Sequence, residues 1–306
     1  MIQSVKSFLF ARFRQGLLRE IEMNRLLTGN LQSRLVRAAT YVDLHEAEFR
    51  VFSQFGEDGL LQYLLGKVQV ANKTFIEFGV ESYRESNTRF LLVNDNWRGL
   101  ILDCDDAHEQ FLRQSDMIWR HDIRAVKAFI TKDNVNTLFR AAGMTGDVGL
   151  LCVDIDGNDY WVLDAIDCVS PRILVAEYNS LYGPTRAVTI PYQSDFNRTQ
   201  AHYSGLYWGA SLAAIHKAAQ TKNLALVACT SAGNNAFFVR RDLLGSLKEC
   251  TPAEAYVEAR YRESRDREGR LTLIGDRAEK LRTISDCPLV DLDAAGQVKP
   301  VGELYA

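Results

Sequence analysis

The sequence predicts an α/β fold built on a doubly wound, mostly parallel sheet of seven strands. From residue 52 onward, short apolar runs alternate with helical stretches, which is typical of βαβ units. The last two apolar runs, 225–230 and 235–241, are separated only by the turn at 231–234. A parallel crossover needs about a dozen residues, so we expect this last pair to be antiparallel. Helical extensions are predicted at both ends, over residues 1–50 and 246–306, around a central domain at 51–245.

Composition excludes several classes of protein. The 306 residues include 36 basic and 39 acidic side chains, and the formal net charge of −3 argues against nucleic-acid binding by overall charge. The six cysteines are scattered without a C-x-x-C pair, which favours reduced thiols in a cytoplasmic protein over a zinc site or a disulfide framework. The sequence has no run of about 18 apolar residues, so no transmembrane helix is predicted.

The first 50 residues carry a basic, amphipathic helical pattern. Apolar residues recur at three- and four-residue spacing at Ile2, Val5, Leu9, Phe13 and Leu17. We expect a second helix over about 31–48, after a break at Gly29-Asn30. Such helices can pack on their own domain or form a homo-oligomer, and we favour these over contact with an anionic membrane surface, because acidic residues dilute the basic face.

The central elements follow in order. We predict helices over about 57–68, 87–93, 125–142 and 211–222, the second of them capped by Ser86 or Asn87. Apolar runs predict strands at 74–80, 99–105, 118–123, 148–156 and 172–179. Residues 251–306 read as a charged tail, in which 259–270 is either a solvated face or an interface helix, with an extended end from Asp291.

Most of the predicted strands end in acidic residues. Because parallel strands present their carboxyl ends at one edge, these acids would build one ligand site there. The pattern is densest in residues 150–160, where an apolar run is followed by three acids. Taken by itself, this stretch could also be an acidic turn that caps a helix. The acids are Glu77, Asp103, Asp105, Asp122, Asp154, Asp156 and Glu177.

The first strand end indicates which ligand to expect. Gly79 allows close approach to the backbone, and the next helix would offer N–H donors near Asn87 and Thr88. Neither a phosphate loop nor the full G-x-G-x-x-G pattern is present. Glu77 favours a cationic ligand, and Asp103 can accept both hydroxyls of a ribose. A ligand with a ribose and a sulfonium but no phosphate is S-adenosylmethionine.

The sequence resembles the FkbM-like methyltransferases over residues 52–241. The resemblance rests on FSQFGEDGLL, TFIEFGVESYRESNTRFLL, LLCVDIDGNDYWV, EYN, YWGASLAAIHK and GNNAFFVR. It implies a class I, Rossmann-like methyltransferase fold and S-adenosylmethionine-dependent O-methylation of a saccharide or related hydroxylated metabolite. It also implies that Glu77, Phe78 and Gly79 face the methionine part, Asp103 the ribose, Asp122 with Ile123 the adenine edge, and Asp154 the sulfonium. The glycine-rich loop of class I enzymes is reduced here to Gly79.

The acceptor side is predicted from the remaining polar groups. Asp156, Glu177 and His202 are candidates for the base that removes the acceptor proton, and Glu177 and Asn179 would face the acceptor. The aromatic segment 190–210 is either an acceptor lid or a helix packed on the sheet.

Two other readings stay open. Asp154, Asp156 and Glu177 could hold a divalent cation, although we favour a metal-free enzyme; Ala165 replaces the glutamate that an EF-hand loop would need. A non-catalytic binding module on the same fold is the second alternative.

Overall fold

The computed structural model describes the backbone of residues 2–306, with side chains described at residue 10, at 12–14 and at 16–306. The predicted apolar positions Ile2, Val5 and Leu9 therefore lie outside the described side chains. Among the helices described, none is long and apolar enough to cross a membrane. The cytoplasmic location stays a prediction.

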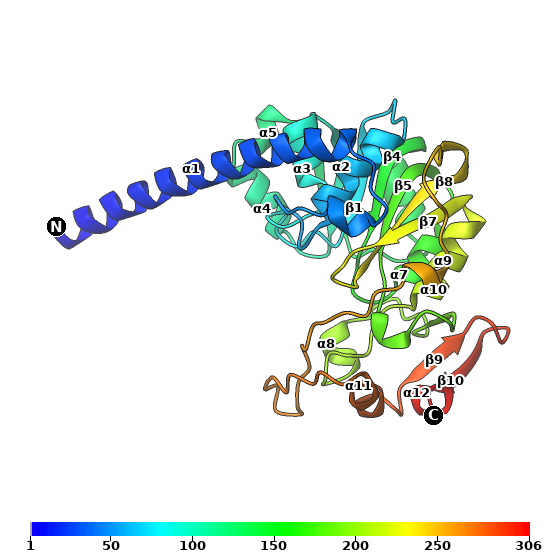
Figure 1. Ribbon diagram of the computed structural model, residues 1–306. Coiled ribbons are helices and arrows are strands. Elements are labelled where there is room, and N and C mark those ends of the chain that lie inside the picture. The colour runs from blue at the N-terminus through cyan, green and yellow to red at the C-terminus, as the bar shows by residue number, and fades with distance from the viewer. Residues whose placement is uncertain (1) are drawn as a thin grey trace.

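A seven-stranded sheet forms the centre of the molecule (Figure 1). Its strand order is β3-β2-β1-β4-β5-β8-β7, and β8 runs antiparallel to both of its neighbours while the first five strands are parallel. This confirms the predicted sheet and its antiparallel final pair. The strands are β1 (Thr74–Phe78), β2 (Arg98–Asp103), β3 (Ile123–Lys127), β4 (Gly146–Val153), β5 (Val169–Glu177), β7 (Leu224–Cys229) and β8 (Asn235–Arg240).

Helices cover both faces of this sheet, so it is doubly wound. Alternate residues of β1 point to opposite faces, with Ile76 and Phe78 in one apolar core and Phe75 in the other. The first core packs against α6 (Val135–Ala141), α7 (Asp159–Ala165) and α9 (Leu212–Thr221). The second packs against α2 (Glu57–Lys67), α3 (Arg89–Asp95), α4 (Ala107–Gln114) and α5 (Met117–Arg120).

The third strand differs from the prediction. Residues 118–123 do not form a strand; Ile118 lies in α5, β3 begins at Ile123, and the helix predicted from 125 begins only at Val135. The physical reason is that β3 is an edge strand that pairs only with β2 and is half-exposed, so it lacks the continuous apolar run of a buried strand.

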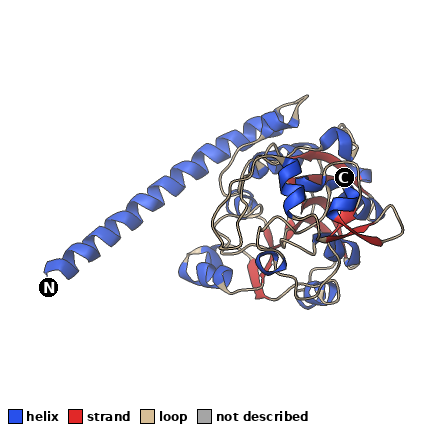
Figure 2. Ribbon diagram, turned by 90° about the horizontal axis from the view of Figure 1, so that it is seen from below, coloured by secondary structure: helices blue, strands red, loops and turns tan. Residues whose placement is uncertain are grey.

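The N-terminal extension is one long helix instead of two. α1 (Ile2–Ala38) runs through Gly29-Asn30 without a break and ends before a short 3₁₀ turn, η1 (Leu44–Ala47). Gly29 does not break the helix but allows it to pack closely on the domain, because a Cβ there would lie 2.5 Å from Val51 Cγ2. The first half of α1 extends away from the rest of the molecule (Figures 1 and 2).

The C-terminal extension joins the segment after β5 in a second lobe. β6 (Val188–Thr189), β9 (Pro288–Asp291) and β10 (Gln297–Pro300) form an antiparallel sheet in the order β10-β9-β6. Leu181, Val188 and Ile190 share an apolar core with Leu281, Leu289 and Val301. The helical elements of this lobe are η2 (Ser180–Tyr182), α8 (Arg198–Ala201), α11 (Arg277–Thr283) and α12 (Val301–Leu304).

Between the two lobes the chain passes through η3 (Arg241–Leu243), α10 (Pro252–Ala255) and a segment without helix at 259–270. The prediction of an interface helix at 259–270 is therefore wrong. The end from Asp291 is extended only in part, since β10 is followed by α12.

Candidate functional site

A cleft of about 890 Å³ lies at the carboxyl edge of the parallel strands. It is lined by residues that follow β1 to β5 and by two segments of the second lobe, 196–205 and 263–269. Eight of the predicted site residues line it together: Glu77, Gly79, Asn87, Asp103, Asp105, Asp154, Asp156 and Glu177.

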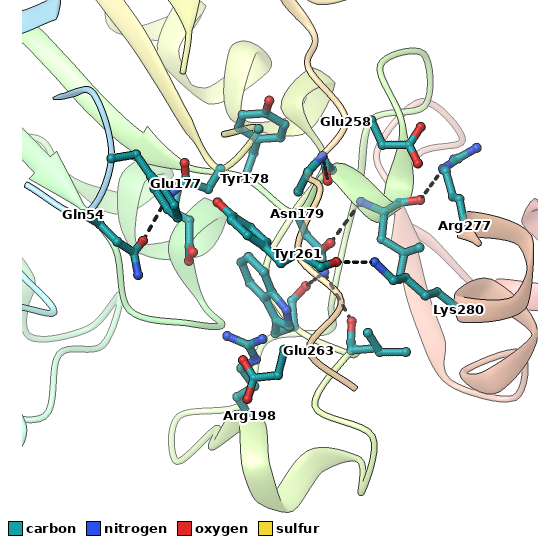
Figure 3. Close-up of a pocket in the computed structure, with 18 residues that line it drawn as sticks. Gln54, Glu177, Tyr178, Asn179, Arg198, Glu258, Tyr261, Glu263, Arg277 and Lys280 are labelled. Atoms are coloured by element: carbon teal, nitrogen blue, oxygen red, sulfur yellow. Dashed lines mark hydrogen bonds between the residues drawn. The ribbon is translucent and has the colours of Figure 1, made fainter. Parts of the chain in front are cut away.

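A second cavity of about 250 Å³ adjoins the cleft (Figure 3). The two share Gln54, Glu177, Arg198 and Glu263 in their linings. The second cavity also has the aromatic side chains Tyr178, Trp208 and Tyr261. Glu177, the last residue of β5, therefore stands where two binding spaces meet.

Glu77 anchors the loop that closes one side of the cleft. Its carboxylate accepts from Ser86 Oγ at 2.6 Å, from Asn87 N at 2.8 Å, and from both the amide and the hydroxyl of Thr88. Burial raises the pKa of Glu77, and these donors oppose the shift. Thr88 is fully buried and lies outside the cleft lining, so its part is to hold Glu77.

Gly79 is required by the chain itself. Its φ is +78°, and a Cβ would lie 1.5 Å from the carbonyl oxygen of Asp154, so the ends of β1 and β4 can meet only at glycine. The predicted place of Phe78 in the site is wrong. Its side chain is fully buried in the core against Phe139.

Asp103 shapes the cleft beside Gly79. Its Oδ2 accepts from the amide of Glu81 at 2.7 Å, and its Oδ1 accepts from the amide of Asp105 at 3.2 Å. Glu81 has a φ of +46°, so Asp103 stabilises a strained turn of the loop after β1. A carboxylate has about four acceptor positions, which leaves capacity for two hydroxyl donors from a ligand.

Asp122 and Ile123 are not at the site. Asp122 precedes β3, and its carbonyl accepts from the amide of Gly99 at the start of β2, so both residues lie at the amino edge of the sheet. The carboxyl end of β3 instead presents Ala128, Phe129 and Ile130 to the cleft. Phe129 is 47% exposed, an apolar ring without full cover at the cleft wall.

Asp154 and Glu177 form a pair of buried carboxyl groups at the cleft floor. Carboxylate oxygens of the two residues lie within 4.8 Å of one another. Burial raises the pKa of both groups well above their usual values, and the nearby charges of Asp156 and Asp159 add to the shift. The pair therefore holds a proton at pH values where free carboxylates have none. Glu177 Oε2 is a buried atom without a hydrogen-bond partner among the described residues.

The other two aspartates of the DIDGND stretch have different roles. Asp159 Oδ1 and Oδ2 accept from the amides of Ile155 and Gly157, at 2.8 and 2.9 Å, and burial raises the pKa of Asp159 to about 6. Asp156, with a φ of +54°, is half-exposed and pairs with Arg198 Nη1 at 2.6 Å. The guanidinium of Arg198 also lies 4.7 Å from the Trp208 ring.

Asn179 and His202 are placed less favourably for chemistry. Asn179 lines the second cavity, but its amide donates to the carbonyls of Leu206 and Trp208, and its Oδ1 accepts from Leu181 N. It thus positions the 206–208 segment. His202 lines neither cavity formed by the described residues, and its Nδ1 contacts Ser204 Oγ at 2.7 Å.

The aromatic segment 190–210 is not a helix packed on the sheet, and its role as an acceptor lid stays a prediction. It belongs to the second lobe, where Tyr207 is buried in the core while Phe196, Tyr203 and Trp208 line the cavities.

Tyr261 is the main residue that the sequence did not indicate. Its ring stacks on Phe55 at a centroid distance of 5.5 Å and extends toward Glu177 (Figure 3). Burial, with the nearby charges of Glu177, Glu57 and Asp154, raises the pKa of the Tyr261 phenol. The charged tail around it has no periodic pattern, and only the packing of the second lobe brings it to the site.

Gln54 was also not predicted, although a local signal exists. Asp58 Oδ2 accepts from the amides of Val51, Phe52 and Ser53, and Glu57 accepts from Phe55 N and from Asn235 Nδ2. Two acids in the first turn of α2 therefore fix the loop that carries Gln54. Acidic residues directly after a glycine turn were the available sign of this anchoring.

No family model and no curated protein matches the chain. Solved methyltransferase structures are similar to it in fold, at low identity. An O-methyltransferase family protein from Burkholderia thailandensis is 11% identical, with a TM-score of 0.37, and the match covers 61% of this chain and 59% of that one. The CurJ carbon methyltransferase is 9% identical, with a TM-score of 0.39, covering 75% and 70%.

A third similar structure is an S-adenosylmethionine-dependent methyltransferase from Clostridium acetobutylicum, 10% identical with a TM-score of 0.33, covering 54% of this chain and 82% of that one. The present chain has a Rossmann-like methyltransferase fold, given by its strand order and the antiparallel β8. Similarity at this level concerns the fold, and the function has to come from the site.

Proposed function

We propose that this chain is an S-adenosylmethionine-dependent methyltransferase that methylates a hydroxyl group of a saccharide or a related metabolite. The observation that carries the proposal is the pair of joined cavities at the carboxyl edge of the sheet, with Glu177 at their junction. A transferase of this kind needs two adjacent binding spaces with the reacting atoms at their boundary.

The larger cleft fits the cofactor. Its volume of about 890 Å³ is within the usual range of about 300–1,000 Å³ for small-molecule sites. Asp103 would accept the ribose hydroxyls, Phe129 with Ile130 would contact the adenine, and Asp154 would favour a sulfonium cation. When bound, the cofactor supplies an electrophilic methyl group.

The smaller cavity suits a hydroxylated ring. Trp208 and Tyr261 offer aromatic faces, while Arg198, Glu263 and Gln54 supply hydrogen-bonding groups around them. Glu177 would take the proton of the acceptor hydroxyl, since the residue lines both cavities and its buried Oε2 has no hydrogen-bond partner among the described residues. Asp154 would hold Glu177 in place.

The buried pair also favours an enzyme over a binding module of the same fold. Two acidic groups held together in a buried site cost folding stability, and such perturbed pairs concentrate at functional sites. Membership of the FkbM-like family is part of this proposal and rests on the motifs within residues 52–241.

A metal-assisted transferase is the second candidate. Ligand atoms of Asp154, Asp159 and Glu177 lie within 4.8 Å of one another, and carboxylate oxygens are the ligands that Mg²⁺ prefers. This set differs from the predicted one, in which Asp156 stood in place of Asp159. The structure directs Asp156 toward Arg198 instead.

Calorimetric titration with S-adenosylmethionine, with and without EDTA, separates the three readings. We expect saturable binding that EDTA leaves unchanged, and methylation of an added acceptor in the same buffer. Turnover that EDTA abolishes and Mg²⁺ restores would favour the metal-assisted enzyme. A folded chain that shows no heat of binding would refute the methyltransferase proposal.

A further inference from the structure

The long helix α1 carries a stripe of exposed apolar side chains along its outer face. Seven of them are between 50% and 70% exposed: Phe10, Phe13, Leu17, Ile21, Leu27, Leu31 and Leu35. At 100° per residue they occupy one third of the helix circumference, with Asn24 in the middle of the stripe. An apolar stripe this long on a monomer surface marks an interaction site.

The stripe is not the face that contacts the methyltransferase domain. That contact is made from the other side of α1, where Gly29, Ser33 and Val36 are buried. Two ion pairs fix it, between Glu22 and Arg89 and between Arg37 and Asp95. The apolar stripe therefore faces away from the domain. The N-terminal half of α1 projects beyond the domain (Figures 1 and 2), and the stripe continues along that half.

The spacing of the stripe is a palindrome. The positions 10, 13, 17, 21, 24, 27, 31, 35 and 38 advance by 3, 4, 4, 3, 3, 4, 4 and 3 residues. The mean step is 3.5 residues, the value at which two helices stay in contact as a left-handed coiled coil. Read in either direction from Asn24, the stripe has the same steps, with an exposed alanine, Ala38, opposite Phe10.

We propose that α1 is the interface of a homodimer, in which two copies pair antiparallel about a two-fold axis at Asn24. A two-fold contact requires a surface that is complementary to itself. In an antiparallel pair this means that each apolar position must meet another apolar position at the same distance on the other side of the axis, and the palindromic stripe meets this condition. Leu17 then contacts Leu31 of the second copy, and Ile21 contacts its Leu27. Each domain then lies on the side of its own α1 that faces away from the second helix.

The size of the stripe is sufficient for a stable dimer. Burial of one large apolar side chain removes on the order of 100 Å² of surface, so fourteen of them remove on the order of 1,400 Å². Specific interfaces bury about 1,200–2,000 Å² in total. Asn24 at the centre would fix the register, as a single polar residue does in a coiled-coil seam.

A lipid surface is the competing occupant of an apolar stripe with arginines beside it. It explains the stripe but not the palindrome, since a helix lying in a membrane interface has no reason to repeat its spacing in reverse. Glu20 lies within the arc of the stripe, at the same angular position as Ala38, and its charge also disfavours an anionic surface.

Sedimentation equilibrium of the full chain tests the proposal and its orientation. The wild-type chain should sediment at twice its own mass. Leu17→Glu should raise the dissociation constant roughly a hundredfold, because it buries a carboxylate against Leu31 in two symmetric contacts. Leu18→Glu is the matched control, since Leu18 is an exposed leucine of the same helix outside the stripe, and should leave the dimer intact.

A charge pair in one chain then decides the orientation. In Leu17→Glu/Leu31→Lys, the antiparallel dimer brings Glu against Lys at both contacts, so the double variant should dimerise more tightly than Leu17→Glu alone. A parallel dimer would bring like charges together and weaken further, which would overturn the orientation. A monomeric wild-type chain would overturn the interface, and its co-sedimentation with phosphatidylserine vesicles would assign the stripe to a membrane.

Discussion

Replacing Glu177 by glutamine separates the chemistry of the site from its stability. Glutamine keeps the size of the side chain and can donate to Asp154, but it cannot accept the acceptor proton. Loss of a positioned base lowers turnover by about 10²–10⁴-fold, which corresponds to about 3–5 kcal/mol of transition-state stabilisation. Cofactor affinity should stay within about twofold, because Glu177 faces the acceptor cavity as well as the cleft.

The same variant should be more stable than the wild type. It removes one of two neighbouring acids and introduces an amide that can donate to Asp154, which we expect to contribute on the order of 1 kcal/mol to the free energy of unfolding. The effect has a pH signature. Because the pKa values of Asp154 and Glu177 are raised in the folded state, the folded chain retains a proton that the unfolded chain releases.

The stability that this protonated pair gives the wild type is therefore fully present at pH values below the pKa values of the unfolded state. It is lost as the pH rises through the higher pKa values of the folded state. The variant should lose less over that range, by up to about 1.4 kcal/mol per pH unit. Urea unfolding at a series of pH values measures this, and methyl transfer with radiolabelled cofactor measures turnover. Glu46→Gln, an exposed glutamate outside both cavity linings, is the control. Full turnover in Glu177→Gln, or loss of cofactor binding, would refute the assignment of Glu177 as the base.

Three further predictions concern single side chains. Asp103→Ala should weaken cofactor binding by about 1–3 kcal/mol in calorimetry, since it removes charge-assisted bonds to the ribose. Asp106 is an exposed neighbour outside the cleft lining, so Asp106→Ala should leave the affinity unchanged. Equal affinities of the two variants would exclude Asp103 from the site. Gly79→Ala should lower the free energy of unfolding by at least about 3 kcal/mol in urea, because the new Cβ meets the Asp154 carbonyl. Gly143 has a similar φ and open space around it among the described residues, so Gly143→Ala should lower the free energy of unfolding by less. Equal losses would show that backbone strain alone causes the effect. Tyr261→Phe should raise KM for the acceptor several-fold and leave cofactor affinity unchanged, and a change confined to cofactor affinity would contradict its place in the acceptor cavity.

The sequence was most informative where strands are buried on both faces. Glu77, Asp103, Asp154 and Glu177 could be placed at one edge because each lies at or next to the end of an apolar run, and an acid cannot continue such a run without a partner. The mostly parallel seven-stranded sheet was predicted from the same runs, whereas its strand order is known only from the structure.

Prediction failed where the local pattern is weak. The edge strand β3 is half-exposed, so its register was shifted, and Asp122 was assigned to the wrong end of the sheet. The 259–270 segment has no period at all, and its place beside Glu177 depends on the pairing of β9 with β6, about 100 residues away in the chain. Contacts at that separation leave no local trace in a single sequence.

A crystal structure of the chain with S-adenosylhomocysteine tests the central claim most directly. We predict that the ribose contacts Asp103, the adenine lies against Phe129, and the sulfur faces the junction at Glu177, with the smaller cavity open beside it. A ligand bound elsewhere on the chain, or an empty cleft at saturating ligand, would contradict the account.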